Sequence, residues 1–342
     1  MKRLLTLILA LVMLFALSAC GDDTPATTPA ATEPAATQPA ATEPGAEDPA
    51  VTEPAAPEYP TFEFTQYGNA KVSIVGAELA KDEYDEPFLR VYYDYTNTGD
   101  TAAGQEPDST LNFQLVTQDG NEIEEFGMYS DDPNTVPEDL MENVSIQPGV
   151  TLRKTRLFEI DPEGGVIDFS CYVMVGSWMY NPDDVELMKF QLDPADLPGA
   201  PEEALEIPEI TDPKYTAGLP TSGTADSAVP YCVSLDGVEQ TTWDDLPALR
   251  VKMTYTNLAS EAWPPCVVLP IYVYQDGYSL EMVSTWYLDE VTEADEAFEN
   301  DVEPNVSTAI NAIFLLRGTN PVEVVIEKPN VEMRIGAAYN IP

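Results

Sequence analysis

The feature that most constrains the fold of this chain is a nine-residue segment of alternating polarity that occurs twice. Residues 89–97 read Leu-Arg-Val-Tyr-Tyr-Asp-Tyr-Thr-Asn, residues 249–257 read Leu-Arg-Val-Lys-Met-Thr-Tyr-Thr-Asn, and six of the nine positions are identical. Large apolar side chains occupy every second position of both copies, which is the period of a strand that buries one face. A strand that recurs so closely predicts two homologous β domains.

Further matches follow each copy in the same order. They are Gln118-Asp119-Gly120 with Gln275-Asp276-Gly277, Glu142-Asn143 with Glu299-Asn300, Pro148 with Pro304, and Phe158 with Phe314. The two Asp-Gly pairs lie between expected strands, where two-residue hairpin turns favour this dipeptide. We therefore expect them to shape turns.

Other segments with a strand pattern fill both copies. They are residues 70–79, 110–118, 151–160, 166–175 and 186–192 in the first copy, and 228–235, 267–275, 279–284, 306–316, 322–327 and 331–338 in the second. Many short strands with almost no helical period are typical of a β-sandwich. The sequence predicts an all-β chain with two tandem sandwiches.

The order of these motifs resembles a known group of domains. A Tyr-Thr-Asn strand, then Gln-Asp-Gly-x-x-x-Glu, then the Pro148-Gly149 turn into a long strand is similar to the immunoglobulin-like domains of unknown function in lipoproteins of Gram-positive bacteria. The likeness covers both repeats and implies Ig-like sandwiches outside the cell, without catalytic residues. The second copy has Asn305 where the first has Gly149, which leaves the form of that turn open.

The N-terminus predicts export and lipidation. Lys2 and Arg3 precede an uncharged run at residues 4–17, which is shorter than the roughly 20 residues that span a bilayer and is typical of a signal peptide. Leu17-Ser18-Ala19-Cys20 resembles the lipobox of bacterial lipoproteins, which implies cleavage after residue 19 and a lipid anchor on Cys20 at the outer face of the membrane. The alternative is an ordinary secretory signal with an incidental cysteine.

A proline-spaced segment, residues 20–59, follows the expected cleavage site. Prolines recur every five residues from Pro29 to Pro54, and residues 21–57 contain seven acidic side chains, no basic one and no Leu, Ile or aromatic residue. Such a segment cannot bury enough apolar surface to fold, so we expect a disordered, extended tether. A second proline-rich segment predicts an interdomain linker at 194–222, between domains at 60–193 and 223–342.

Composition excludes several classes of function. The chain has 60 acidic and 15 basic residues, and loss of residues 1–19 removes two of the basic ones. This charge disfavours nucleic acid and anionic lipid headgroups as partners. Histidine is absent, which excludes Ser-His-Asp triads, Cys-His dyads and histidine-ligated metals. No Gly-rich phosphate loop occurs, and we expect no organic cofactor.

The long acidic loops of the two copies are weak candidates for Ca²⁺ binding. The candidate ligands are Asp131, Asp132 and Asn134 in the first copy and Asp295 and Glu299 in the second. Carboxylate and amide oxygens suit Ca²⁺, and long loops are often functional. The spacing matches no EF-hand, and the alternative is a solvated loop or a short helix at 293–299.

Two groups of residues are candidates for contacts with a partner. Arg153, Lys154 and Arg156 form the basic cluster of the expected mature chain and could bind an anionic glycan or a peptide carboxylate; alternatively, they neutralise the acidic loops. The aromatic candidates are Trp178, Tyr180 and Trp263. Exposed aromatic residues anchor protein or glycan partners, whereas the alternative places them in the core.

Three cysteines remain once Cys20 carries lipid. An odd count precludes complete internal pairing. Cys171 lies in an apolar strand, where we expect a buried free thiol, and a disulfide between Cys232 and Cys266 stays open.

These observations lead to two hypotheses about function. The first is a non-catalytic cell-surface lipoprotein that presents two Ig-like domains to an extracellular or envelope protein or glycan. The second is an envelope hydrolase that uses a pair of carboxylates as acid and base.

Overall fold

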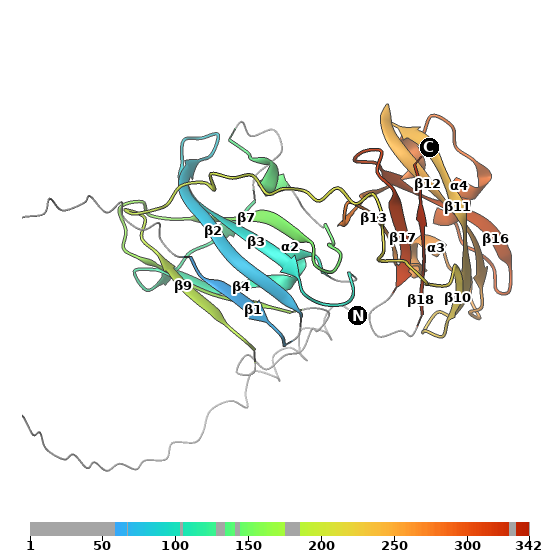
Figure 1. The fold of residues 1–342 in the computed structure, drawn as a ribbon, viewed down its shortest axis with the longest axis horizontal. Coiled ribbons are helices and arrows are strands. Elements are labelled where there is room, and N and C mark those ends of the chain that lie inside the picture. Colours follow the sequence, from blue (N-terminus) through green and yellow to red (C-terminus); the bar gives the residue numbers. More distant parts are fainter. Residues whose placement is uncertain are drawn as a thin grey trace, which may run out of the picture. The chain divides into compact units, whose positions relative to one another are not determined.

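Antiparallel sheet dominates the structure. The computed structural model describes residues 59–66, 68–102, 105–127, 134–140, 144–174, 185–327 and 333–341, and within Pro54–Pro342 they form one compact unit. Four antiparallel sheets make up two β domains (Figure 1). The prediction of an all-β fold is confirmed. The expected signal peptide, Cys20 and the tether up to residue 58 lie outside the described residues.

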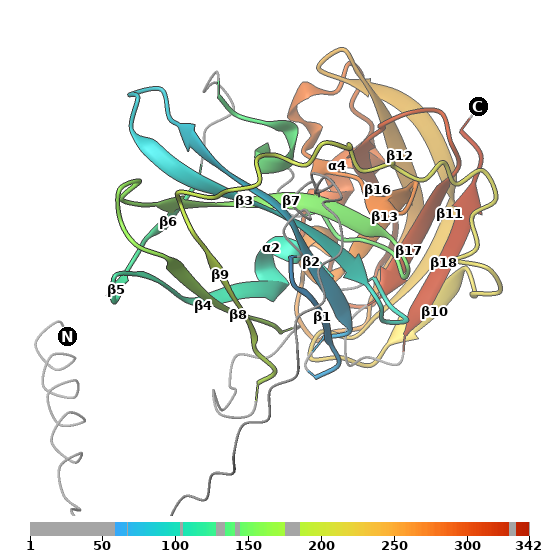
Figure 2. The same ribbon diagram turned by 60° about the vertical axis from the view of Figure 1, so that its left-hand side comes forward.

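The first domain pairs a five-stranded sheet, in the order β1-β2-β3-β7-β6, with a four-stranded sheet, in the order β5-β4-β8-β9. Figure 2 shows β2, β3 and β7 in one layer and β4, β8 and β9 in the other. The elements are β1 (Thr61–Phe64), β2 (Ala70–Lys81), β3 (Pro87–Asn97), α2 (Pro107–Thr110), β4 (Leu111–Gln118), β5 (Asn121–Glu122), β6 (Glu125–Phe126), the 3-10 helix η2 (Pro137–Leu140), β7 (Thr151–Glu159), β8 (Ile167–Val173) and β9 (Met188–Leu192).

The second domain repeats this plan strand for strand. Its sheets run β10-β11-β12-β16-β15 and β14-β13-β17-β18. The elements are β10 (Ser222–Ala225), β11 (Tyr231–Trp243), β12 (Leu246–Asn257), α3 (Pro265–Val268), β13 (Ile271–Gln275), β14 (Tyr278–Ser279), β15 (Met282–Val283), the 3-10 helix η4 (Thr285–Tyr287), α4 (Glu293–Glu299), β16 (Ser307–Leu315), β17 (Val322–Glu327) and β18 (Arg334–Tyr339).

The strand order is that of an immunoglobulin-like sandwich. In the first domain β2, β3, β7 and β6 take the places of strands A, B, E and D, while β4, β8 and β9 take those of C, F and G. An additional strand, β1, extends the first sheet, and β5 pairs with β4. The second domain has the same arrangement, so both copies of the repeat have the Ig-like fold.

The repeated segment forms the centre of both cores. Leu89, Val91, Tyr93 and Tyr95 on β3 are fully buried, and the matching side chains on β12 are equally buried: Leu249, Val251, Met253 and Tyr255. These residues belong to two separate apolar clusters, one in each sandwich. The period of two therefore identified one buried face of each strand. The opposite face is not fully exposed as expected, because Arg90 and Tyr92 on β3 and Arg250 on β12 are buried as well.

The repeated asparagine ends its strand in the same way in both domains. The Asn97 amide donates to the carbonyl oxygens of Thr101 and Ile146, and the Asn257 amide donates to those of Glu261 and Val302, at 2.7–2.9 Å. Both asparagines are fully buried. Each one holds together two loops at one end of its sandwich.

The turns that precede β7 and β16 have the same backbone conformation, although their residues differ. Gly149 has φ +79° and Asn305 has φ +60°, and their N–H groups donate to the carbonyls of Asn97 and Asn257. Asparagine adopts the left-handed region more readily than most residues, so the substitution preserves the turn. The Asp119-Gly120 and Asp276-Gly277 pairs likewise form two-residue hairpin turns, with positive φ at all four residues.

Several expected strands begin later than their patterns suggested, and short helices precede two of them. Residues 267–268 belong to α3, and β13 starts at Ile271; in the first domain α2 takes up Thr110 before β4 begins at Leu111. Proline occupies the first position of both helices, where its missing N–H costs nothing. The short strands β1 and β10 were not predicted from the sequence.

The segment expected as a linker packs against both domains. Gly199 forms a bridge with Ala77 of β2. The Tyr215 hydroxyl accepts from the Ala102 N–H and donates to Glu327 on β17, each at 2.7 Å.

Within the described residues no helix is long and apolar enough to cross a bilayer. The boundaries at 193/194 and 222/223 stay predictions.

Candidate functional site

A buried arginine holds the acidic loop of each domain. Arg90 on β3 contacts Asp139 of η2 at 3.0 Å and Glu78 of β2 at 2.8 Å. In the second domain Arg250 on β12 takes the matching carboxylate, Asp295 of α4, at 3.2 Å. Both aspartates are almost completely buried. In both domains, the arginine of the repeated Leu-Arg-Val sequence therefore holds the acidic loop through an ion pair.

Asp295, one of the Ca²⁺ candidates, has a structural role in the described residues. Burial raises the pKa of its carboxyl group, but hydrogen bonds from the Thr292 N–H, Asn311 and Arg250 outweigh that effect and hold the pKa below its ordinary value. With Thr292 it also forms a capping box at the start of α4. The short helix that the sequence left as an alternative spans Glu293–Glu299.

The other Ca²⁺ candidates do not gather around Asp295. Asp131 and Asp132 lie outside the described residues. Asn134 is exposed in the first domain, where its carbonyl accepts from Arg90, and Glu299 lies on the exposed face of α4. Among the described residues no group of three acidic or cysteine side chains could hold a metal ion. Ca²⁺ binding stays a prediction.

Each residue of the basic cluster on β7 has an acidic neighbour. Arg153 binds Asp94 through two hydrogen bonds of 2.7 and 3.0 Å, the buried Lys154 pairs with Asp108 of α2, and Arg156 pairs with Glu125 of β6. The Arg156 guanidinium also lies 5.7 Å from the centre of the Phe113 ring. These contacts favour neutralisation of acidic side chains over recognition of an anionic partner.

The second domain has apolar residues at the positions of this internal ion pair. The register of β12 with β16 matches Lys154 to Ile310 and Arg156 to Ala312, and the second residue of α3 matches Asp108 to Cys266. The charges inside the first sandwich are therefore specific to that copy and are not needed for the fold.

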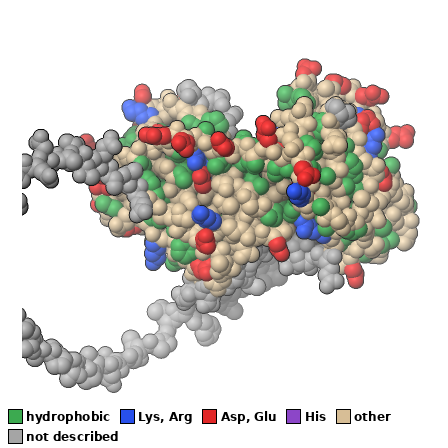
Figure 3. Space-filling model, in the orientation of Figure 1, with side chains coloured by type: hydrophobic (Ala, Val, Ile, Leu, Met, Phe, Trp, Pro, Cys, Tyr) green, Lys and Arg blue, Asp and Glu red, His purple; other side chains and the backbone are tan. Residues whose placement is uncertain are grey.

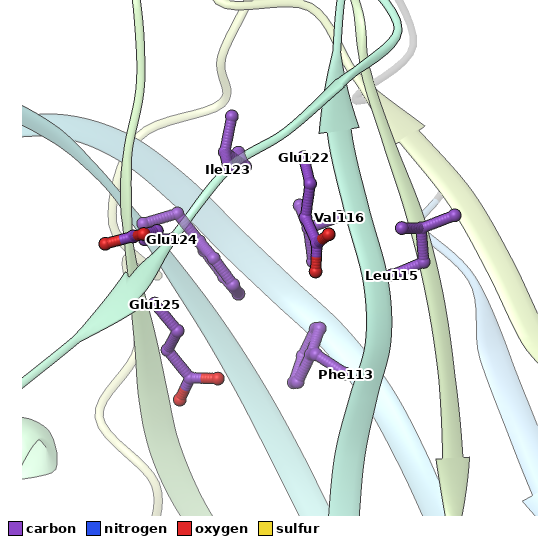
Figure 4. Close-up of a pocket in the computed structure, with 8 residues that line it drawn as sticks. Phe113, Leu115, Val116, Glu122, Ile123, Glu124 and Glu125 are labelled. Atoms are coloured by element: carbon purple, nitrogen blue, oxygen red, sulfur yellow. The ribbon is translucent and has the colours of Figure 1, made fainter. Parts of the chain in front are cut away.

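A cavity of about 480 Å³ opens in the first domain among residues of β4, β5, β6 and β7 (Figure 4). Its walls are Phe113, Leu115, Val116, Glu122, Ile123, Glu124, Glu125 and Phe158. Figure 4 shows the Glu124 carboxylate pointing away from Glu122. The third glutamate, Glu125, pairs with Arg156. The cavity thus combines apolar walls with an acidic rim.

The three described cysteines are free thiols. Cys171 is buried on β8, as expected, and Cys232 and Cys266 are half-buried and not joined to each other. Burial raises the pKa of the Cys171 thiol to about 12, which keeps it protonated and unreactive at neutral pH.

An exposed aromatic surface lies at one end of the second domain. We define it by five residues: Trp243, Leu246, Met282, Trp286 and Tyr287. Trp286 is 84% exposed and Tyr287 59% exposed, and Leu246 and Met282 are each about half exposed. An open surface of this kind is a common feature of protein interaction sites.

Two chain segments build the aromatic surface and are joined to each other. Trp243 and Leu246 flank the β11–β12 turn, in which Asp244 and Asp245 both have positive φ. The Trp243 indole donates to the Ser284 carbonyl at 2.7 Å and packs edge-on against Tyr287 at 5.2 Å. The Asp244 N–H donates to the Tyr287 carbonyl at 2.9 Å. Hydrogen bonds between the two segments therefore hold the surface in place.

None of the aromatic residues chosen from the sequence is among the five that define the aromatic surface. Trp178 and Tyr180 lie outside the described residues, and Trp263 is half-buried where its backbone pairs with Val302. The sequence did offer a signal for the aromatic surface, because Trp243-Asp244-Asp245 places a tryptophan beside a turn. That signal alone does not indicate a surface, because the surface also requires an exposed Trp286, and the local sequence around Trp286 does not predict its exposure.

Comparison with known proteins gives a domain assignment without a function. Residues 46–166 match the sequence model of DUF5067, a domain of unknown function. A solved structure described as that of a candidate lipoprotein from Staphylococcus aureus subsp. aureus NCTC 8325 is a distant match, with 10% identity and a TM-score of 0.29, covering 35% of this chain and 93% of that one. No curated protein matches the chain. The DUF5067 match covers the first copy of the repeat through β7 and ends before β8, and the expected likeness of the second copy to the same group stays a prediction.

Proposed function

We propose that this chain is a non-catalytic envelope lipoprotein that binds an extracellular or envelope partner through the aromatic surface of its second domain. The lipobox-like Leu17-Ser18-Ala19-Cys20 sequence supports a lipid anchor at the outer face of the membrane. The acidic, proline-spaced segment that follows supports a tether that carries the domains away from the membrane.

The observation that carries the proposal is the exposure of Trp286 and Tyr287. Tryptophan and tyrosine contribute most to binding at protein interfaces, and both residues are mostly accessible to solvent here. A sandwich that only needed to fold would gain from burying these side chains. The hydrogen bonds that join the two segments of the surface also reduce the ordering that a partner must impose.

The described buried carboxylates support a role without catalysis. Asp139 and Asp295 are paired with arginines, Glu327 with Arg334, and Glu323 accepts from the Thr216 N–H and from Gln147. A catalytic carboxylate must be free to exchange protons with a substrate. These four carboxylates instead hold loops and segments together.

Photo-crosslinking on intact cells tests the proposal. The photoreactive amino acid p-benzoylphenylalanine replaces Trp286 in the full chain, and the control chain carries it at Tyr84, which is 76% exposed in the first domain. We expect discrete adducts from position 286 that are absent from position 84. The same adducts from both positions, or none from position 286, would refute the proposal.

A further inference from the structure

We infer that the aromatic surface binds a cationic polypeptide segment, one that presents lysine or arginine side chains; this inference rests on the proposed function. Four acidic residues lie beside the surface along the chain. Asp244 and Asp245 form the turn between Trp243 and Leu246, and Asp289 and Glu290 follow Tyr287 along the chain. All four carboxylate-bearing residues are exposed.

The cations that the structure describes in the second domain have other neighbours. Arg250 and Lys252 contact Glu239 on β11, and Arg334 pairs with Glu327. Arg317 lies over the Tyr278 ring at 5.8 Å. Arg250 also donates to the main-chain carbonyl of Glu290. Among residues 223–327 and 333–341 no ion pair joins a lysine or arginine to the rim of the aromatic surface, the side-chain carboxylates of Asp244, Asp245, Asp289 and Glu290. Figure 3 shows acidic side chains gathered over the upper right of the second domain.

Open aromatic rings beside carboxylates suit one class of ligand group. An ammonium or guanidinium group is attracted to the face of a tryptophan ring, and a nearby carboxylate adds a charge-assisted hydrogen bond. The stem of a lysine or arginine side chain also covers apolar surface while its charged end stays near water. Trp286, with Asp289 and Glu290 close along the chain, offers both kinds of contact.

Charge excludes other occupants of the same surface. A second copy of this chain carries the same excess of 60 acidic over 15 basic residues and would be repelled. Anionic lipid headgroups would be repelled for the same reason. A neutral glycan could stack on Trp286 but would leave the rim carboxylates without a counter-charge. A cationic polypeptide can contact the aromatic rings and also neutralise the rim carboxylates.

A titration with defined peptides tests the inference. The full-length chain, in micelles of an uncharged detergent, is titrated with fluorescent peptides of equal length that alternate glycine with lysine, serine or glutamate. We expect the lysine peptide to bind at least tenfold more tightly than the serine peptide at low salt, and its affinity to fall as salt screens the charges.

Two pairs of variants locate the binding. Asp244→Asn with Asp245→Asn removes two rim charges while asparagine keeps the left-handed turn, and Glu83→Gln with Asp85→Asn removes two exposed charges from the corresponding hairpin of the first domain. Trp286→Ala is matched by Tyr84→Ala. We expect a loss of tenfold or more from the Asp244/Asp245 and Trp286 variants and less than twofold from their controls.

The outcomes separate the inference from the proposed function. Equal losses from the Asp244/Asp245 pair and its control would show that lysine peptides bind the acidic chain without a site, and would overturn the inference. Tighter binding of the serine peptide, or a crosslinked partner at position 286 that is a glycan, would overturn the inference and leave the proposed function standing. Failure of the crosslinking at position 286 would remove both.

Discussion

Arg250 and Asp295 show how a single buried ion pair can determine the conformation of a loop. The guanidinium comes from the central strand β12, the carboxylate from α4, and Asn311 on β16 donates a further hydrogen bond of 2.9 Å to Asp295. Burying two charges is costly, and their attraction compensates only when hydrogen bonds satisfy both groups. The first domain uses Arg90 and Asp139 in the same way.

Asp295→Asn should destabilise the second domain by about 3–5 kcal/mol at pH 7, because it removes the buried counter-charge of Arg250 and leaves that guanidinium the half-exposed Glu239 at 3.5 Å. The folded pKa of Asp295 lies below its unfolded value. Its stabilisation is therefore present above about pH 4 and is lost as the pH falls through the folded pKa. Urea denaturation followed by tryptophan emission should show a wild-type advantage at pH 7 that narrows at pH 3.

Asp301→Asn, an exposed change just after α4, is the control and should shift the free energy of unfolding by less than about 0.5 kcal/mol. An Asp295→Asn variant as stable as this control at pH 7 would contradict the assigned role of the ion pair.

At the scale of single residues, sequence reasoning identified buried positions better than exposed ones. Alternation placed Tyr95 and Tyr255 in the core because a strand with one buried face leaves a pattern of period two. Nothing local marks Trp286 as exposed, because its exposure results from a short 3-10 helix that follows β15. The partners of Lys154 and Arg156 come from α2 and β6, which the sequence did not bring together.

At the scale of elements, the duplication acts as an internal control. Each strand of the first domain has a counterpart in the second, and the sheet orders are the same. The sequence predicted most strands because both copies carry matching motifs. It missed α2 and α3 because four-residue helices leave no helical period, and proline at their first position was the one available signal.

The comparison of the domains predicts how the internal ion pair of the first one responds to substitution. Asp108→Ala alone removes the carboxylate that pairs with the buried Lys154, and should cost about 3 kcal/mol, at the low end of the usual range because Asp108 is a quarter exposed. Asp108→Cys combined with Lys154→Ile installs the pair found in the second domain and should be within about 1 kcal/mol of wild type.

Urea denaturation of the full-length variants, followed by far-ultraviolet circular dichroism, measures both effects. A double variant that loses as much stability as Asp108→Ala would show that the charges are required by the first sandwich and have not merely been accommodated in it.

At the scale of the whole molecule, the chain combines a strongly acidic composition with two domains of one fold. Internal ion pairs engage much of its small complement of cations, so the remaining surface carries the acidic excess. An acidic excess of this size repels other acidic surfaces, which is the charge argument for the cationic segment proposed above. The location of the binding surface could not be predicted from composition, because it depends on which loops of the second domain expose aromatic rings.

Amide hydrogen exchange of the full-length chain, with and without a saturating lysine–glycine peptide, determines whether the aromatic surface is the binding site. We predict slower exchange on binding in residues 241–247 and 282–291, and unchanged exchange in residues 83–86 of the corresponding hairpin of the first domain. Binding that slows exchange in the first domain and leaves residues 241–247 and 282–291 unchanged would contradict this prediction.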